Sequence, residues 1–272
     1  MPAWTLPAFF AAWVAIGVTI AIERLGGKRG GLVGSLPTTI VPASIGFHSV
    51  SNSVIDFQDA LFITPAGMLV NALFLLMWRI VPPRLPAVHT YFRLSMCVVI
   101  TMIGWLVMAL GAIEITKNID QVGLSRNHWA IVLTLTMATL GVLACKRNPP
   151  APRASSTVGL PAIIIRGLVA GSAIGGAVWL ANHGGPLIAG VAAVFPAIFM
   201  TTLCSLWLSH GESVGAGAIG PLMLGGTSVS AYSWFAAWCM PSMGVGVGSA
   251  VAWATAVLVV TVPAWMWLER QK

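Results

Sequence analysis

Long apolar runs constrain the fold of this chain more than any other feature of its sequence. A helix needs about 20 apolar residues to cross the hydrocarbon core of a bilayer. The runs of this kind cover residues 5–23, 30–48, 58–79, 91–114, 127–145, 160–181, 186–209, 213–238 and 243–267. In lipid, only helices and closed barrels satisfy their own backbone hydrogen bonds. The pattern therefore predicts an all-α, polytopic membrane protein with about nine transmembrane helices.

The scarcity of charge supports this interpretation. Only 8% of the residues are charged, whereas 57% are hydrophobic, and a soluble domain carries about 25% charged residues. The formal net charge of +7 does not indicate nucleic acid, because the basic residues are scattered over short loops. We expect the lipid bilayer as the main partner and no nucleic acid.

The placement of the basic residues predicts the orientation. With the N-terminus outside, the loops and tail on the inner side hold most of the Lys and Arg residues. The outer segments hold only Lys117 and Arg126. Basic residues are enriched in cytoplasmic loops. We therefore predict a multi-pass protein of the bacterial inner (cytoplasmic) membrane, with its N-terminus outside and its C-terminus cytoplasmic. The run at 5–23 lacks a basic start and an A-x-A site, so we expect it to be retained.

The two halves of the chain resemble each other across the polar stretch at 146–156. GLVGSLP ends at Pro37 and GVAAVFP ends at Pro196, an offset of 159 residues (196 − 37). ITPAGML and IGPLMLG, and likewise Trp78 and Trp234, match at an offset of 156 (234 − 78). Matching helices are five places apart in the order of predicted helices, an odd number, so the second copy is inverted in the membrane. The predicted units are a four-helix repeat at 1–117, a linking helix with a cytoplasmic linker at 118–159, and a second four-helix repeat at 160–272.

The second half also resembles the GlpM-like family of small inner-membrane proteins. The positions that match the family signature are Ile188-Ala189-Gly190, Phe195-Pro196, Ser209, Gly211 and Glu212. The resemblance covers about 160–270 and, more loosely, 7–115. In the first half Leu36-Pro37 replaces Phe-Pro, and Asp56 or Asp59 replaces the acidic residue. The resemblance implies a four-helix membrane unit, fused here to a second copy, and it leaves the activity open.

The segment LVGSLPTTIVP, 32 to 42, is unusual for a helix in lipid because it holds two prolines and three hydroxyl residues. Proline releases the carbonyl four residues back, and that carbonyl must find another donor. One interpretation is a kinked helix in which local hydroxyls supply the donor. The other is a broken helix that lines a substrate path, favoured because Pro196 breaks the matching run. The candidate substrate-binding residues are Ser35, Pro37, Thr38, Thr39, Asn71, Pro196, Thr201, Thr202 and Ser205.

Titratable residues near helix ends are candidates for proton coupling. His48 and His210 end two of the predicted helices, and Glu212 lies two residues after His210. Histidine titrates near neutral pH, so a His210–Glu212 pair could relay protons. The alternative is that each histidine only hydrogen-bonds the carbonyls at the end of its helix. Without H-x-x-x-H or C-x-x-C spacing, we expect no metal and four free cysteines.

Two functions remain open from the sequence, and neither is enzymatic, since no G-x-S-x-G, H-E-x-x-H or P-loop pattern occurs. The favoured hypothesis is a small secondary transporter that moves a small polar or weakly charged solute by alternating access, with an inverted-repeat architecture like that of drug/metabolite transporters. The alternative is a regulator, assembly factor or subunit of a membrane complex, with a homo-oligomer or a membrane protein as partner. We expect no cofactor. A polar cavity between the two proline breaks favours transport, and tight packing there favours the alternative.

Overall fold

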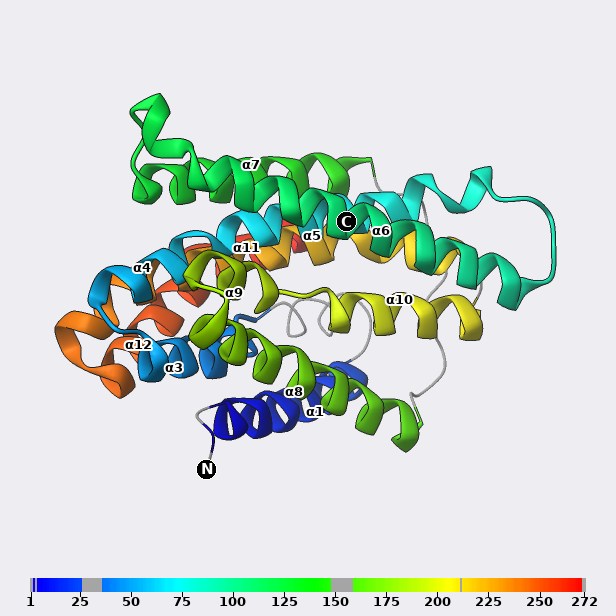
Figure 1. Ribbon diagram of the computed structural model, residues 1–272. Helices are drawn as coiled ribbons and strands as arrows, with labels where there is room; N and C mark the ends of the chain where they lie inside the picture. The colour runs from blue at the N-terminus through cyan, green and yellow to red at the C-terminus, as the bar shows by residue number, and fades with distance from the viewer. Residues whose placement is uncertain (1, 3, 26–35, 148–158, 211, 271–272) are drawn as a thin grey trace.

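A computed structural model describes residues 2, 4–25, 36–147, 159–210 and 212–270, which form a bundle of helices without any strand in these ranges (Figure 1). The helices are α1 (Thr5–Leu25), α3 (Ile40–Val50), α4 (Val54–Phe62), α5 (Thr64–Ile80), α6 (Thr90–Lys117), α7 (Arg126–Lys146), α8 (Leu160–His183), α9 (Pro186–Ala192), α10 (Ala197–His210), α11 (Glu212–Met243), α12 (Val245–Ala256) and α13 (Val262–Arg270). Short turns η1 (Pro82–Arg84) and η2 (Ile119–Val122) lie between them, and the π-helical turn η3 (Val257–Thr261) joins α12 to α13.

The lengths of these helices support a polytopic membrane protein. Within the described ranges, six helical stretches are long and apolar enough to cross a membrane. They are Val54–Ile80, Thr90–Lys117, Arg126–Lys146, Ile163–His183, Pro186–Cys204 and Val245–Arg270. Large apolar side chains also face outward, as on α6, where Ile103, Leu106 and Leu110 are all more than half exposed. Exposed apolar surface of this extent is typical of contact with lipid.

Several of the predicted helices are interrupted. The run predicted at 58–79 is divided at Ile63 into α4 and α5, and the run at 186–209 is divided between α9 and α10. In the last run, the amide of Val262 donates to the carbonyl of Val257, five residues back, which is π-helical spacing. Pro263 has no N–H for an α-helical bond and its ring crowds the preceding turn. The wider π turn just before it accommodates the proline.

Glycines allow α8 to approach α1 closely. A Cβ on Gly171 would lie 2.8 Å from the carbonyl oxygen of Ala8, and one on Gly167 would lie 2.7 Å from Ile16. Small residues four apart are typical of closely packed helices in membranes. The repeated glycines of this helix therefore serve packing between the first helix of each half.

The longest helix, α11, lies at the centre of the bundle. It packs against α3, α4, α5, α7, α10 and α12. Tyr232, in its middle, is fully buried together with Phe47 of α3 and Phe74 of α5. α11 also continues through Pro221, whereas the matching Pro65 stands at the start of α5, directly after the interruption at Ile63. The two matching prolines thus have different structural roles.

Candidate functional site

Pro37 and Pro196 each lie at the centre of a tight backbone turn. The amide of Thr38 donates to the carbonyl of Leu36 over 2.7 Å, and the amide of Ala197 donates to the carbonyl of Phe195, also over 2.7 Å. Both prolines are buried. The first turn precedes α3, and the second separates α9 from α10. The same short hydrogen bond therefore spans the proline in both halves of the chain.

Asn71 of α5 joins the second turn to another helix. Its Nδ2 donates to the carbonyl of Val194 over 2.6 Å, and its Oδ1 accepts from the indole N–H of Trp105 over 2.8 Å. The rings of Trp105 and Phe195 meet edge to face, with centroids 5.3 Å apart. Asn71 is only 2% exposed. A buried side-chain amide, rather than a local hydroxyl, therefore satisfies a carbonyl within this break.

The predicted threonines bond to their own backbone or lie beside it. Thr201 donates to the carbonyl of Ala197 over 2.9 Å, and Thr38 makes a longer contact of 3.4 Å with that of Leu36. Thr39 precedes α3 but makes no capping bond with its side chain, and Thr202 is half-buried. Ser35 and the side chain of Ser205 lie outside the described residues. The breaks thus hold few hydroxyls that are directed toward each other.

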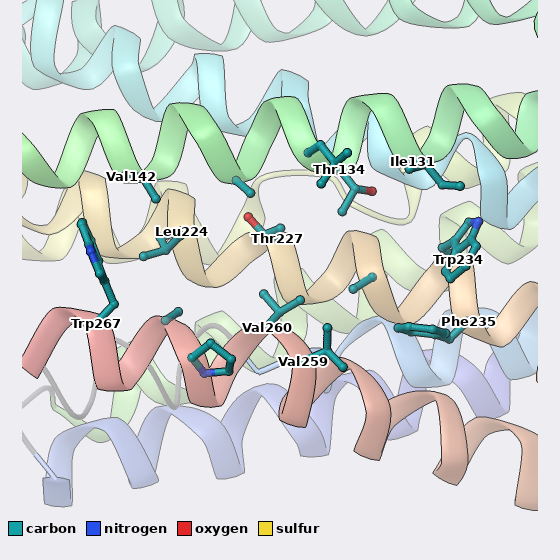
Figure 2. A pocket seen from close by; sticks show the side chains of 15 residues that line it. Ile131, Thr134, Val142, Leu224, Thr227, Trp234, Phe235, Val259, Val260 and Trp267 are labelled. Atoms are coloured by element: carbon teal, nitrogen blue, oxygen red, sulfur yellow. The ribbon is translucent and has the colours of Figure 1, made fainter.

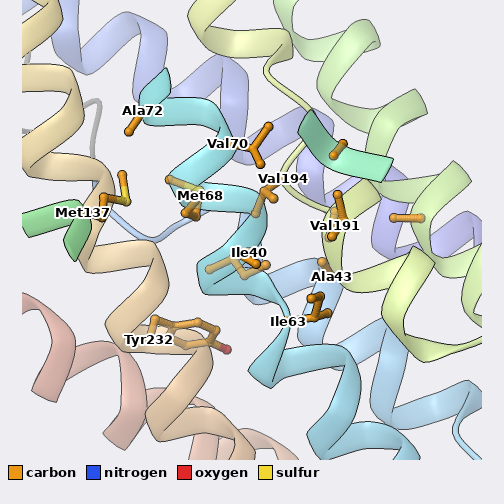
Figure 3. Close-up of a cluster of buried hydrophobic side chains, with 14 of the residues drawn as sticks. Ile40, Ala43, Ile63, Met68, Val70, Ala72, Met137, Val191, Val194 and Tyr232 are labelled. Carbon is orange, nitrogen blue, oxygen red and sulfur yellow. The ribbon is translucent and has the colours of Figure 1, made fainter. Parts of the chain in front are cut away.

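A cluster of apolar side chains joins α3 to the segment before the second turn. Ile40 and Ala43 of α3 lie near Ile63, Val191 and Val194, and each of these five is less than 8% exposed (Figure 3). Two neighbouring glycines have no room for a side chain. A Cβ on Gly67 would overlap Val194, and one on Gly190 would overlap the backbone of Ala60. The described side chains around the second break are therefore tightly packed, whereas a mainly apolar cavity of about 200 Å³, lined in part by Thr38 and Pro42, lies beside the first. The polar cavity that would favour transport is not found among them in this conformation.

A chain of hydroxyl groups links three helices beside this core. The Oγ of Ser44 donates to the carbonyl of Val41 over 2.9 Å and lies 2.7 Å from the Tyr232 hydroxyl. That hydroxyl also lies 2.8 Å from Oγ of Ser249. Since Ser44 uses its only proton on Val41, Tyr232 donates to Ser44 and accepts from Ser249. α3, α11 and α12 are thereby joined through one tyrosine.

The candidate proton-coupling residues have different surroundings from those predicted. His48 is exposed at the end of α3, where its ring lies edge to face with Phe57, 5.2 Å between centroids. Glu212 forms an ion pair with Arg93 of α6 over 2.9 Å. The side chain of His210 lies outside the described residues, so the His210–Glu212 pair stays a prediction.

Two ion pairs lie at opposite ends of the bundle (Figure 1). Glu212 and Arg93 meet where α11 and α6 begin, and Arg93 also donates to the carbonyl of Pro82 over 3.0 Å. At the other end Asp59 of α4 pairs with Arg126, the first residue of α7. Sequence reasoning named Asp59 and Glu212 as acidic positions, but it used the basic residues, Arg126 among them, only to predict the orientation. Nothing in the spacing of Arg93 and Arg126 indicates which distant carboxylate each one meets.

The chemistry of the described residues is that of buried hydrogen bonds and ion pairs. No group of three His, Cys, Asp or Glu side chains in the described ranges is arranged to hold a metal ion. The six long apolar stretches identify the chain as an integral membrane protein. Comparisons with protein-family models, curated proteins and solved structures found no match, so the resemblance to the GlpM-like proteins stays a prediction.

Proposed function

We propose that this protein is a small secondary carrier built from two inverted four-helix repeats, with nine membrane helices in all. The observation that carries the proposal is the pair of proline turns, in which the carbonyls of Leu36 and Phe195 accept the same 2.7 Å hydrogen bond across Pro37 and Pro196. Broken helices at corresponding places in two repeats are the best sequence indication of a transport site at the membrane midplane.

The packing of the helices supports a two-fold relation between the repeats. α1 packs along α8, and α5 packs along α11. In the proposed alignment α8 is the counterpart of α1, and α11 is the counterpart of α5. A two-fold axis that passes between the repeats brings such matching helices into contact. α3 contacts α12, and their counterparts, α10 and α6, also contact each other. These pairs are expected if the repeats exchange places about an axis in the membrane plane.

The packed centre corresponds to a carrier that is closed at both ends. The Glu212–Arg93 pair holds one end and the Asp59–Arg126 pair holds the other. Alternating access then breaks one pair at a time and separates the apolar side chains between the turns. The solute is small and polar or weakly charged, because the turns provide carbonyls and an amide but no central charge. The proposed location is the bacterial inner membrane, with the N-terminus outside.

Uptake by the reconstituted protein tests the proposal. Purified protein in liposomes is offered a panel of small radiolabelled solutes, with and without a pH gradient. We expect saturable uptake of at least one solute, and Asn71→Leu should lower it about 10-fold or more, because it leaves the Trp105 N–H and the Val194 carbonyl without partners at the break. Asn182→Leu, at an exposed position near the end of α8, is the matched control. If folded wild-type protein transports nothing on the panel, the carrier proposal fails.

A role as a regulator, assembly factor or subunit of a membrane complex is the second candidate. It is favoured by the tight packing around the second break and by exposed aromatic side chains on the paired helices α1 and α8, where Trp13 is 60% and Trp179 is 49% exposed. Purification in a mild detergent after cross-linking in membranes tests it. A single partner retained in fixed ratio, and lost on Trp13→Ala, supports this role.

A further inference from the structure

An open cavity of about 510 Å³ lies between α7, α11 and the η3–α13 segment, and two of its lining residues, Leu135 and Val259, are more than half exposed (Figure 2). It is apolar along most of its length, with Leu135, Val142 and Val260 among the residues that line it. Trp234 and Phe235 stand at one end and Trp267 at the other. Pockets of roughly 300–1,000 Å³ with apolar walls and few polar groups are typical of small-molecule sites.

Two buried hydroxyls beside this cavity have no hydrogen-bond partner among the described residues. They belong to Thr227 of α11, which lines the cavity and is 3% exposed, and to Thr261 of η3, which is 5% exposed. Buried polar groups are nearly always hydrogen-bonded, so each exception needs a reason. Threonine in a helix populates two χ1 rotamers, so rotation can direct the Thr227 hydroxyl into the cavity. η3 is also a π-helical turn, a feature frequent at functional sites.

The other half of the chain shows what fills the equivalent place. In the repeat alignment Thr227 matches Asn71 (227 − 71 = 156), and Thr261 matches Trp105 (261 − 105 = 156). In the first half the Trp105 indole fills the space between α5 and α6 and donates its N–H to Asn71. In the second half a small side chain replaces the indole, and the hydroxyl that replaces the amide lacks a partner. Thr261 itself does not line the cavity, but the cavity borders Thr227, whose counterpart Asn71 is bonded to a planar ring through one hydrogen bond.

We propose that this cavity binds a neutral, mainly apolar ring compound of about the size of indole, with one N–H or C=O group that hydrogen-bonds to Thr227. The absence of charged residues among its lining residues fits a neutral ligand. The flanking Trp and Phe rings provide edge and face contacts for a planar molecule. An apolar cavity of about 150 Å³ already binds benzene in another protein. The assignment of the ligand rests on the repeat alignment of the proposed function, but binding does not require transport.

Equilibrium dialysis of the full chain in detergent with radiolabelled indole or naphthalene tests this inference. We expect both compounds to bind saturably. Thr227→Val should weaken indole binding about 2- to 12-fold, the effect of one net hydrogen bond, and leave naphthalene unchanged, because naphthalene has no polar group. Thr134→Val is the matched control: Thr134 also lines the cavity, but its hydroxyl donates to the carbonyl of Ala130 over 2.7 Å. It should change neither affinity.

A substitution that fills the cavity distinguishes binding of these compounds at this site from their partition into the detergent micelle. Ala264→Trp restores a ring beside Thr227 and should abolish saturable binding of both compounds, and Ala138→Phe on α7 is the second variant if the first does not fold. Equal saturable binding of indole by the wild type and by a folded variant with a filled cavity overturns the inference, as does an equal effect of Thr227→Val and Thr134→Val on indole binding. Saturable binding of indole or naphthalene without transport of any solute would contradict the carrier proposal but not this inference. Transport of other solutes without saturable binding of indole or naphthalene would contradict this inference but not the carrier proposal.

Discussion

Single side chains join distant helices in this protein, and Tyr232 is the clearest case. Its hydroxyl connects Ser44 of α3 to Ser249 of α12 from the centre of α11. In a bundle whose interior is mainly apolar, such a hydrogen bond fixes which residues of neighbouring helices lie opposite each other. Removing one member leaves the others buried without a partner.

Tyr232→Phe should therefore lower stability without creating a large cavity. We expect a loss of about 1–3 kcal/mol, since Ser249 loses its acceptor and Ser44 loses its donor. Tyr91→Phe is the matched control, because Tyr91 is 65% exposed. Thermal unfolding in detergent measures both. Equal midpoint temperatures of unfolding for the two variants would contradict the structural role of the Tyr232 hydroxyl.

At this scale the sequence predicts some residues of the site and misses others. Asn71 stands out in the sequence because an amide in the middle of an apolar run must be satisfied. Trp105 and Tyr232 do not stand out, because their partners lie 34 and 188 residues away in the chain. The grouping of Pro196, Asn71 and Trp105 depends on how three helices pack, which local patterns do not record.

At the scale of helices, the contact between α1 and α8 depends on glycines on one face of α8. Gly171 faces the backbone of Ala8, whereas Gly176, also on α8, has no atom within 4 Å of the place a Cβ would take. The two glycines lie on the same helix, but only Gly171 is packed against another helix. The sequence pattern alone indicates close packing but not which glycines face the partner.

Gly171→Leu should separate α1 from α8. We expect a loss of about 1–3 kcal/mol from overpacking, whereas Gly176→Leu should change stability little. Thermal unfolding in detergent, together with a cross-link between cysteines placed on α1 and α8, measures the effect. A Gly171→Leu variant as stable as Gly176→Leu would contradict the contact.

Apolar runs predict the limits of these helices well and their interruptions poorly. α1, α6, α7 and α8 begin and end within a few residues of the predicted runs. The breaks at Ile63 and η3 were not predicted, because a run of apolar residues has the same composition whether or not its backbone is continuous. Each break is stabilised by surrounding helices that the sequence does not identify.

For the whole molecule, the arrangement of charge predicts how the bundle lies in the membrane. In a chain with its four native cysteines replaced, Gln121→Cys should react with an impermeant maleimide added outside intact cells, and Lys146→Cys should react only after lysis. Both positions are exposed, at opposite ends of α7 and the turn before it. The reverse labelling pattern would invert the proposed orientation and leave the fold unchanged.

The position of α11 has a consequence for the energetics of motion. Its first residue, Glu212, is bonded to α6, while near its other end Trp234 donates to Asn127 of α7 and the carbonyl of Ala237 accepts from Gln58 of α4. In the proposed carrier, opening toward either side of the membrane would thus break a different, small set of polar bonds at one end of α11. The relative populations of the outward-open and inward-open forms of this carrier would then depend on the difference between the free energies of breaking these two sets of bonds. For such a carrier, a substitution at one tip of α11 would change which side of the membrane the protein faces at rest.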